Sequence, residues 1–405
     1  MDDAVSGAGH AARRAATDFG PTRESPQGSY VNTFIRIRPT ESRARRTISA
    51  RRRAMAIRRI GSLLLLAILA TVGCGYTLAQ AQEPSDLTKL TLEELMKIDV
   101  VSINVLATHI HFAGQWMAAY EYMLEDMDGN RDGTRRVSHA QILQQFDTAP
   151  TNMSVETHMA TLMYAPTGDV TLSAMLPYLL KTMNHVTRSG VRFTEHSEGI
   201  GDLQLGVLGT VYRWGRFEHE FLLNAGVSVP TGSIDEKDFG PNRTQGKLRL
   251  EYDDQLGSGT VDLLPGITYL GQSANWAWGS EMIPTVRLGR NSNHYRLGNR
   301  YRLSSWTARK WTDWLSMTGQ VDGQLWENID GADPRLNPAA APTKDPNRQG
   351  GRRIDLLLGL NLYAPSGILK GQRLAVEAGA PVYQSLDGPA LQMDWLVRVG
   401  WQWIF

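Results

Sequence analysis

The stretch Leu391-Gln-Met-Asp-Trp-Leu-Val-Arg-Val-Gly-Trp-Gln-Trp-Ile-Phe405 decides the fold, because its apolar residues recur at every second position. Between them lie mostly polar or small residues, among them Gln392, Asp394, Arg398 and Gln402. A period of two is that of a β-strand, whose successive side chains point to opposite faces. Tryptophans and the final phenylalanine lie on the apolar face, which is typical of outer-membrane barrels. The stretch therefore predicts a strand of a transmembrane β-barrel.

The same alternation recurs upstream, over Ile354–Leu362, Leu374–Ala378 and Phe221–Val227, with charged or polar residues on the second face. Turn-forming Gly, Pro, Asn or Asp residues follow such runs. We predict strands that begin near residues 115, 153, 169, 200, 217, 259, 275, 293, 312, 352, 372 and 390. The predicted fold class is all-β: an antiparallel up-and-down transmembrane barrel of about 12 strands over residues 113–405.

The lengths of the connections support a barrel with periplasmic termini, in which long loops follow odd-numbered strands and tight turns follow even-numbered ones. The long polar segments are 127–152, 182–198, 231–256 and 327–351, and the tight turns are Pro166–Asp169, Trp214–Arg216 and Gly271–Ala274. A soluble β-sandwich is the alternative, because its strands alternate as well. It would not account for the aromatic edges or for the asymmetry of the loops.

The N-terminal part is predicted to be export sequence rather than fold. Residues 1–54 are rich in Arg, Ser and Gly and have almost no apolar periodicity, which indicates a disordered or wrongly assigned upstream region. Residues 55–81 contain the charged, apolar and small-residue parts of a signal peptide, so Met55 is a candidate start. A lipid-anchored Cys74 is the alternative, although the usual leucine three residues upstream is missing.

Residues 82–112 are predicted to form a periplasmic segment with a short helix over Ser85–Asp99, where apolar residues follow a helical period. The single cysteine, Cys74, precedes this segment, so the exported part has no thiol for a disulfide, a catalytic cysteine or a zinc–thiolate site. A formal net charge of +1 and 20% charged residues give no indication of nucleic-acid binding.

Several hairpin motifs resemble those of the meta-pathway phenol-degradation family of outer-membrane proteins, whose members are often described as transporters. The motifs are Tyr164-Ala-Pro-Thr-Gly-Asp-Val-Thr171, Gly199-Ile-Gly-Asp-Leu203, Asn224-Ala-Gly-Val-Ser-Val-Pro-Thr-Gly-Ser233 and Leu362-Tyr-Ala-Pro365. The resemblance spans nearly all of residues 112–405. It implies a barrel in the outer membrane of a Gram-negative bacterium that passes or binds a small, aromatic or otherwise hydrophobic solute.

Charged residues on the inner face are candidates for contact with such a solute. They are Glu121, Glu156, Arg296, Arg300, Arg353, Asp355 and Arg398. Both signs occur in near balance, so two interpretations stay open: a polar lumen that selects solutes, or a structural network of ion pairs that fills the barrel.

Methionine and histidine are concentrated in one region, where the run from Trp116 to His185 resembles a Met- and His-rich subgroup that we associate with copper handling. Thioether and imidazole together suit copper, above all Cu(I). The candidate ligands are Met117, Met123, His158, Met175, His109 and His111. The pleat would place Glu156 and His158 on the lumen face and Met159 and Met163 on the outer face. The alternative is methionine as flexible apolar filler, with no cofactor.

A lipid hydrolase is a further alternative, because His196-Ser197 resembles part of an outer-membrane hydrolase site. A nucleophile needs a base within hydrogen-bond reach and a third, orienting group, and no motif supplies them. We therefore expect no enzyme activity. The expected partners are outer-membrane lipid, a small-molecule solute and the barrel assembly machinery, which would recognise the C-terminal strand ending at Phe405.

Overall fold

The computed structural model describes residues 109–215 and 219–405. The predicted upstream region, signal peptide and helix over Ser85–Asp99 lie outside these residues. Among the described residues, no helix is long and apolar enough to cross a membrane.

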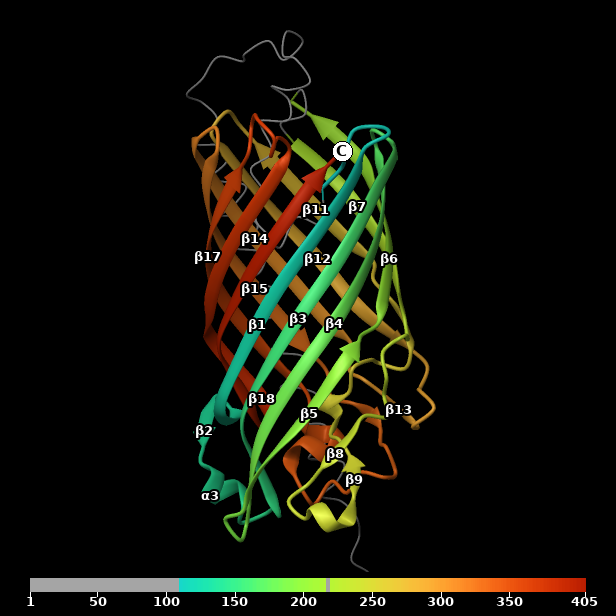
Figure 1. The fold of residues 1–405 in the computed structure, drawn as a ribbon, viewed down its shortest axis with the longest axis vertical. Coiled ribbons are helices and arrows are strands. Elements are labelled where there is room, and N and C mark those ends of the chain that lie inside the picture. Colours follow the sequence, from blue (N-terminus) through green and yellow to red (C-terminus); the bar gives the residue numbers. More distant parts are fainter. Residues whose placement is uncertain (1–108, 216–218) are drawn as a thin grey trace, which may run out of the picture. The chain divides into compact units, whose positions relative to one another are not determined.

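A single antiparallel sheet closes on itself to form a barrel (Figure 1). Each strand of the ring pairs with the next along the chain, and β1 pairs with β18 to close it. Within the described residues the ring consists of β1 (Trp116–Gly133), β3 (Thr148–Thr167), β4 (Val170–Thr187), β6 (Leu203–Trp214), β7 (His219–Val229), β11 (Gly266–Gln272), β12 (Trp276–Leu288), β14 (Arg300–Thr312), β15 (Leu315–Trp326), β17 (Gly351–Tyr363) and β18 (Gln372–Ile404). The predicted all-β, antiparallel, closed barrel is therefore confirmed.

The described ring has eleven strand elements rather than the predicted twelve, because the strands predicted from residues 372 and 390 form one element, β18, whose two arms run in opposite directions. It pairs with β17 through residues 373–386 and with β1 through residues 386–404. Its two arms fold against each other: the Gln384 side chain donates to the Met393 carbonyl (2.7 Å) and accepts from the Met393 amide (2.9 Å). The residues that connect the two arms are also in extended conformation, so β18 is one continuous strand element.

The strands are apolar outside and polar inside, the reverse of a soluble protein. In β15, Gln320 and Asp322 are buried inside the barrel, whereas Met317 and Val321 are exposed on its outer surface. An apolar exterior around a closed ring is stable only in lipid, where closure also satisfies every strand edge. The protein is therefore a β-barrel of the outer membrane.

Aromatic side chains gather at the end of the barrel that carries the tight turns. Trp311 and Trp314 flank the β14–β15 turn and are exposed. The ring of Trp116 lies 4.6 Å from that of Tyr164, and Trp403 packs against Phe405 at 4.7 Å. Such a girdle marks the level of the lipid headgroups.

The opposite end is larger than predicted, because β1, β3 and β4 are long strands that extend into it (Figure 1). β1 extends to Gly133 and β3 begins at Thr148, so much of the predicted loop 127–152 is strand. The remaining short elements are β2 (Arg135–Val137), α3 (His139–Ile142), β5 (Arg192–Ile200), β8 (Lys237–Phe239), η5 (Arg243–Gln245), β9 (Lys247–Arg249), η6 (Tyr252–Asp254), β10 (Val261–Leu263), β13 (Tyr295–Arg296), β16 (Asp330–Gly331), η7 (Pro342–Lys344) and η8 (Pro346–Arg348).

Ion pairs hold these loops together. Arg249 pairs with both Asp333 and Asp235, and Arg335 Nε lies 3.0 Å from Asp333 Oδ1. Burial alone would raise the pKa of Asp333, but hydrogen bonds from Arg335 and the charge of Arg249 outweigh it, so the pKa is lowered. The pKa of Asp235 is lowered in the same way, as the hydrogen bond and charge of Arg249 outweigh its burial.

We predict that acid loosens the loops before it affects the barrel. Because the folded pKa of both aspartates is lowered, their stabilisation is complete above about pH 4 and is lost as the pH falls through the lowered values. Pepsin at about pH 2 should then cut within residues 231–260. Gel mobility before and after boiling should show that the closed barrel persists.

At neutral pH, Arg249→Ala should expose the same loops to chymotrypsin, because it removes a partner of the buried Asp333 carboxylate. The matched control is Arg290→Ala, whose ion pair with Asp330 is exposed and contributes at most about 1 kcal/mol. Equal cleavage of the two variants would contradict the assignment.

Candidate functional site in the barrel lumen

Paired charges cover one side of the lumen, on β14, β15, β17 and β18. Asp322 Oδ2 lies 2.9 Å from Arg302 Nη2 and 3.8 Å from Arg398 Nη2. Arg398 Nη1 in turn lies 3.1 Å from Glu377 Oε2. Buried ions of this kind require such partners, since an unpaired charge away from water is costly. The lumen charges therefore neutralise one another on this side.

Further predicted lumen residues extend this charged wall. Arg353 Nε lies 2.8 Å from Asp355 Oδ2, and Arg353 Nη2 lies 3.8 Å from Glu125 Oε1 on β1. Glu121 also lies on the inner face of β1, where it is paired in register with Met159 of β3. Arg300 shares the inner face with Arg302, and its guanidinium lies 5.9 Å from the centre of the Trp326 ring.

Three residues do not lie where the sequence placed them. Arg296 belongs to the β13–β16 hairpin outside the barrel ring, where its Nη2 lies 3.5 Å from Asp330 Oδ2. Glu156 and His158 face outward, not into the lumen, because the β1–β3 register pairs them with Leu124 and Tyr122, which lie on the outer face.

Tyrosine hydroxyls satisfy the two polar groups on the outer face. The Tyr122 hydroxyl donates to Glu156 Oε2 (3.0 Å), and the Tyr120 hydroxyl lies 2.6 Å from His158 Nδ1. His158 is therefore no part of a metal site in the lumen.

Methionines line the adjoining part of the lumen, on β1, β3 and β4. These three strands are neighbours in the ring, and β1 lies next to β18 (Figure 1). Eight of them among the described residues lie on the inner face and form what we call the methionine wall: Met117, Met123, Met127, Met153, Met159, Met163, Met175 and Met183. The placement of Met159 and Met163 on the outer face was wrong, because register pairs Met163 with the buried Met117 and Met159 with Glu121. The wall is thus larger than sequence predicted.

Histidines stand beside one end of this wall. His109 and His111 are buried, with ring centroids 4.4 Å apart. The Gln402 side-chain amide lies 3.3 Å from His109 Nε2 and donates to the Met117 sulfur (2.6 Å). Of the predicted metal ligands, His109, His111 and Met117 therefore come together, whereas Met123 and Met175 lie further along the wall.

Burial favours the neutral form of the His111 imidazole. Burial, followed by the neighbouring His109 and Arg373, lowers the pKa of His111 to about 2. The His111 Nε2 atom is buried and has no hydrogen-bond partner among the described residues. A neutral imidazole nitrogen with a free lone pair is the form that binds metal ions.

His196 and Ser197 do not form a hydrolytic pair. The Ser197 hydroxyl is buried and donates to the Asp254 carbonyl (2.6 Å). His196 is exposed on the other face of β5, where its Nδ1 lies 3.1 Å from Thr182 Oγ1. Consecutive strand residues point apart, so these two cannot act on one substrate as nucleophile and base.

A closed barrel with an apolar exterior and a lumen lined by thioethers and paired charges defines a β-barrel protein of the outer membrane. The chain belongs to the family described as "Putative MetA-pathway of phenol degradation", whose model matches residues 128–376. The family resemblance predicted from the hairpin motifs is thereby confirmed. No curated protein matches the sequence.

Solved structures of outer-membrane proteins resemble this chain at low sequence identity. The COG4313 outer membrane channel from Pseudomonas putida F1 is 12% identical, covers 76% of this chain and 100% of its own, and has a TM-score of 0.53. The P. putida toluene transporter TodX is 9% identical, with 72% and 89% coverage and a TM-score of 0.36. The KdgM porin is 9% identical, with 71% and 99% coverage and a TM-score of 0.34.

We predict that Arg398→Ala destabilises the barrel, since it leaves the buried Asp322 and Glu377 with one partner fewer. Breaking such a pair costs on the order of 3 kcal/mol. The control is Arg352→Ala on β17, whose side chain lies over the Tyr383 ring, 5.8 Å from its centre. The folded form of Arg398→Ala should convert to the slow-migrating form at a clearly lower temperature than the control, and equal temperatures would contradict the network.

Proposed function

We propose that this protein is an outer-membrane transporter that passes a small aromatic solute along the methionine wall. The observation that carries the proposal is the division of the lumen into a thioether side and a charged side. Because the charges pair with one another, they leave little net field to attract an ionic solute. Methionine side chains adapt their shape and make favourable sulfur–aromatic contacts of about 0.3–1.5 kcal/mol each.

The family description supports the same solute class, since it names phenol degradation. A pathway that consumes phenols needs their entry through the outer membrane. A small aromatic molecule also fits a surface that offers polarizable apolar contacts without fixed geometry. The placement of the inner-facing methionines is therefore the feature to test.

We predict that the double variant Met159→Gln, Met175→Gln lowers phenol flux into proteoliposomes roughly tenfold, because two sulfur–aromatic contacts are lost and polar groups replace them. Met159→Leu, Met175→Leu keeps the apolar surface and should retain most of the flux. Met282→Leu, on the outer face, serves as the matched control. Flux that is equal for phenol and for a sugar of similar size, and is unchanged by the double variant, would contradict the proposal.

A copper-binding role is the second candidate, and the Gln402 side chain, which bridges His109 and Met117 at the end of the methionine wall, favours it. Imidazole and thioether ligands suit Cu(I). Met117 and the unpaired His111 Nε2 would supply ligands of both kinds. The aromatic-solute proposal tolerates leucine in place of methionine, whereas copper binding requires the sulfur atom.

We predict that, if copper binds here, Met117→Leu and His111→Ala each weaken Cu(I) binding at least tenfold in competition with a chromogenic chelator. His196→Ala, an exposed histidine at the other end of the barrel, should leave binding unchanged. Binding that is absent in the native protein, or the same in all variants, would exclude copper as the function of this cluster.

Recognition of the C-terminal strand by the assembly machinery stays a prediction.

A further inference from the structure

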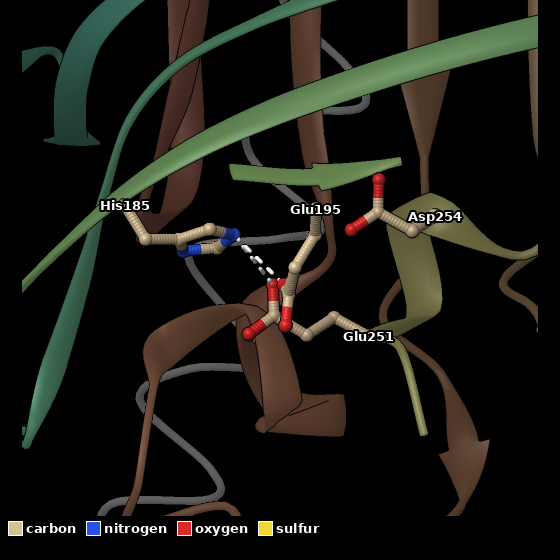
Figure 2. Close-up of side chains that lie close together, drawn as sticks. All are labelled: His185, Glu195, Glu251 and Asp254. Carbon is tan, nitrogen blue, oxygen red and sulfur yellow. Dashed lines mark ion pairs between the residues drawn. The ribbon is translucent and has the colours of Figure 1, made fainter. Parts of the chain in front are cut away.

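Four buried side chains converge beyond the membrane, at the end opposite the tight turns (Figure 2). His185 lies near the C-terminal end of β4 and Glu195 lies on β5. Glu251 and Asp254 belong to the segment around η6. None is more than 3% exposed, and one ligand atom from each lies within 4.8 Å of the others. Three different parts of the chain thus bring one imidazole and three carboxylates to the same point.

The polar atoms in this cluster lack the partners that burial demands. His185 Nε2 lies 3.0 Å from Glu195 Oε2 and 3.8 Å from Glu251 Oε2. Neither carboxylate oxygen of Asp254 accepts a hydrogen bond from any described residue, and the same holds for Glu251 Oε2. Buried polar groups are almost always hydrogen-bonded, so several orphaned oxygens aimed at one point indicate a missing positive group.

The charges around the cluster do not balance. Among the described residues, Lys344 forms an ion pair with the cluster, its Nζ lying 3.5 Å from Glu251 Oε1. Lys181 is close by, but its ammonium donates to the backbone carbonyls of Asp253 and Gln255 (2.7 Å each). With a neutral imidazole at His185, three carboxylates against the ammonium groups of Lys344 and Lys181 still leave an excess of negative charge that a divalent cation would neutralise.

We propose that His185, Glu195, Glu251 and Asp254 bind a divalent metal ion of the zinc or manganese type. One nitrogen and three oxygen donors suit Zn²⁺, a borderline ion, and Mn²⁺, a harder ion that prefers oxygen, whereas Cu(I) prefers the sulfur that this cluster lacks. The ligand atoms must close in from their present spacing to about 2.0–2.2 Å from the ion, which small side-chain rotations achieve.

The neighbours of the cluster hold its ligands in place. The His185 ring is stacked on Phe193, with centroids 4.9 Å apart and planes 12° from parallel, which fixes the direction of the imidazole. Ser197 donates to the Asp254 carbonyl (2.6 Å), and Lys181 holds the same segment through its two carbonyl contacts. A bound ion would therefore fasten the segment around η6 to β4 and β5 at the outer mouth of the barrel.

The test is a calorimetric titration of the full chain, purified in detergent and stripped with EDTA, with Zn²⁺ and separately with Mn²⁺. We expect one equivalent to bind, and we expect Asp254→Asn and Glu195→Gln each to weaken binding at least tenfold. Glu198→Gln is the matched control, because Glu198 lies on the same strand with its side chain exposed. Heat-modifiable gel mobility checks that every variant still forms the barrel.

Proteolysis of the loop provides a second readout. The metal should slow cleavage within residues 246–256 in the native protein and in Glu198→Gln, but not in Asp254→Asn. Absence of saturable binding, equal binding by all variants, or binding of Ca²⁺ with neither Zn²⁺ nor Mn²⁺ would overturn the proposal. None of these results depends on phenol flux. The metal-site proposal can therefore be wrong while the transport proposal is right, and the transport proposal can be wrong while the metal-site proposal is right.

Discussion

Closure of the sheet, by pairing of β1 with β18, is the constraint on which the rest of the structure depends. In lipid no water is available to satisfy an open strand edge, so every backbone amide and carbonyl must be paired within the ring. Met117 pairs with Ile404 at one end of this seam and Gly133 with Leu386 at the other, which joins the two ends of the barrel sequence. Closure then defines a lumen and a lipid-facing surface. Successive side chains of each strand face one and then the other, so their polarity must alternate accordingly.

The inside is not uniform, and its two sides follow from which strands are neighbours. β1, β3 and β4 are adjacent and each contributes methionines, so the thioethers form one continuous wall. β14, β15, β17 and β18 contribute arginines and carboxylates close enough to pair, as Arg398 does with Glu377. The charged side is rigid because each ion depends on its partner, whereas the methionine side can adapt its shape. This contrast is the physical basis of the transport proposal.

Beyond the membrane, the strands and loops use buried charge instead of an extensive apolar core. Tyr252 and Tyr295 belong to a small apolar cluster, and around it lie the Arg249–Asp333 pair and the carboxylates near His185. Buried ions hold a loop only while all their partners are present, so such loops respond to pH and, under our proposal, to metal ions. The membrane part has buried ion pairs as well, such as Arg398 with Glu377, but backbone pairing around the closed ring and contact with lipid stabilise it in addition.

The sequence by itself determined the fold class and nearly all strand positions, because a period of two is a local property that residues 391–405 display without any partner. It also identified the family from hairpin motifs such as Asn224–Ser233, and it selected Arg353, Asp355 and Arg398 for the lumen. Only the tertiary structure decided which face Met159, Met163, Glu156 and His158 occupy, since that depends on the register between strands, which alternation within one strand does not contain. The same holds for His109 beside Gln402 and for Glu251 beside His185: residues distant in the chain meet only when the barrel closes and its loops fold over it.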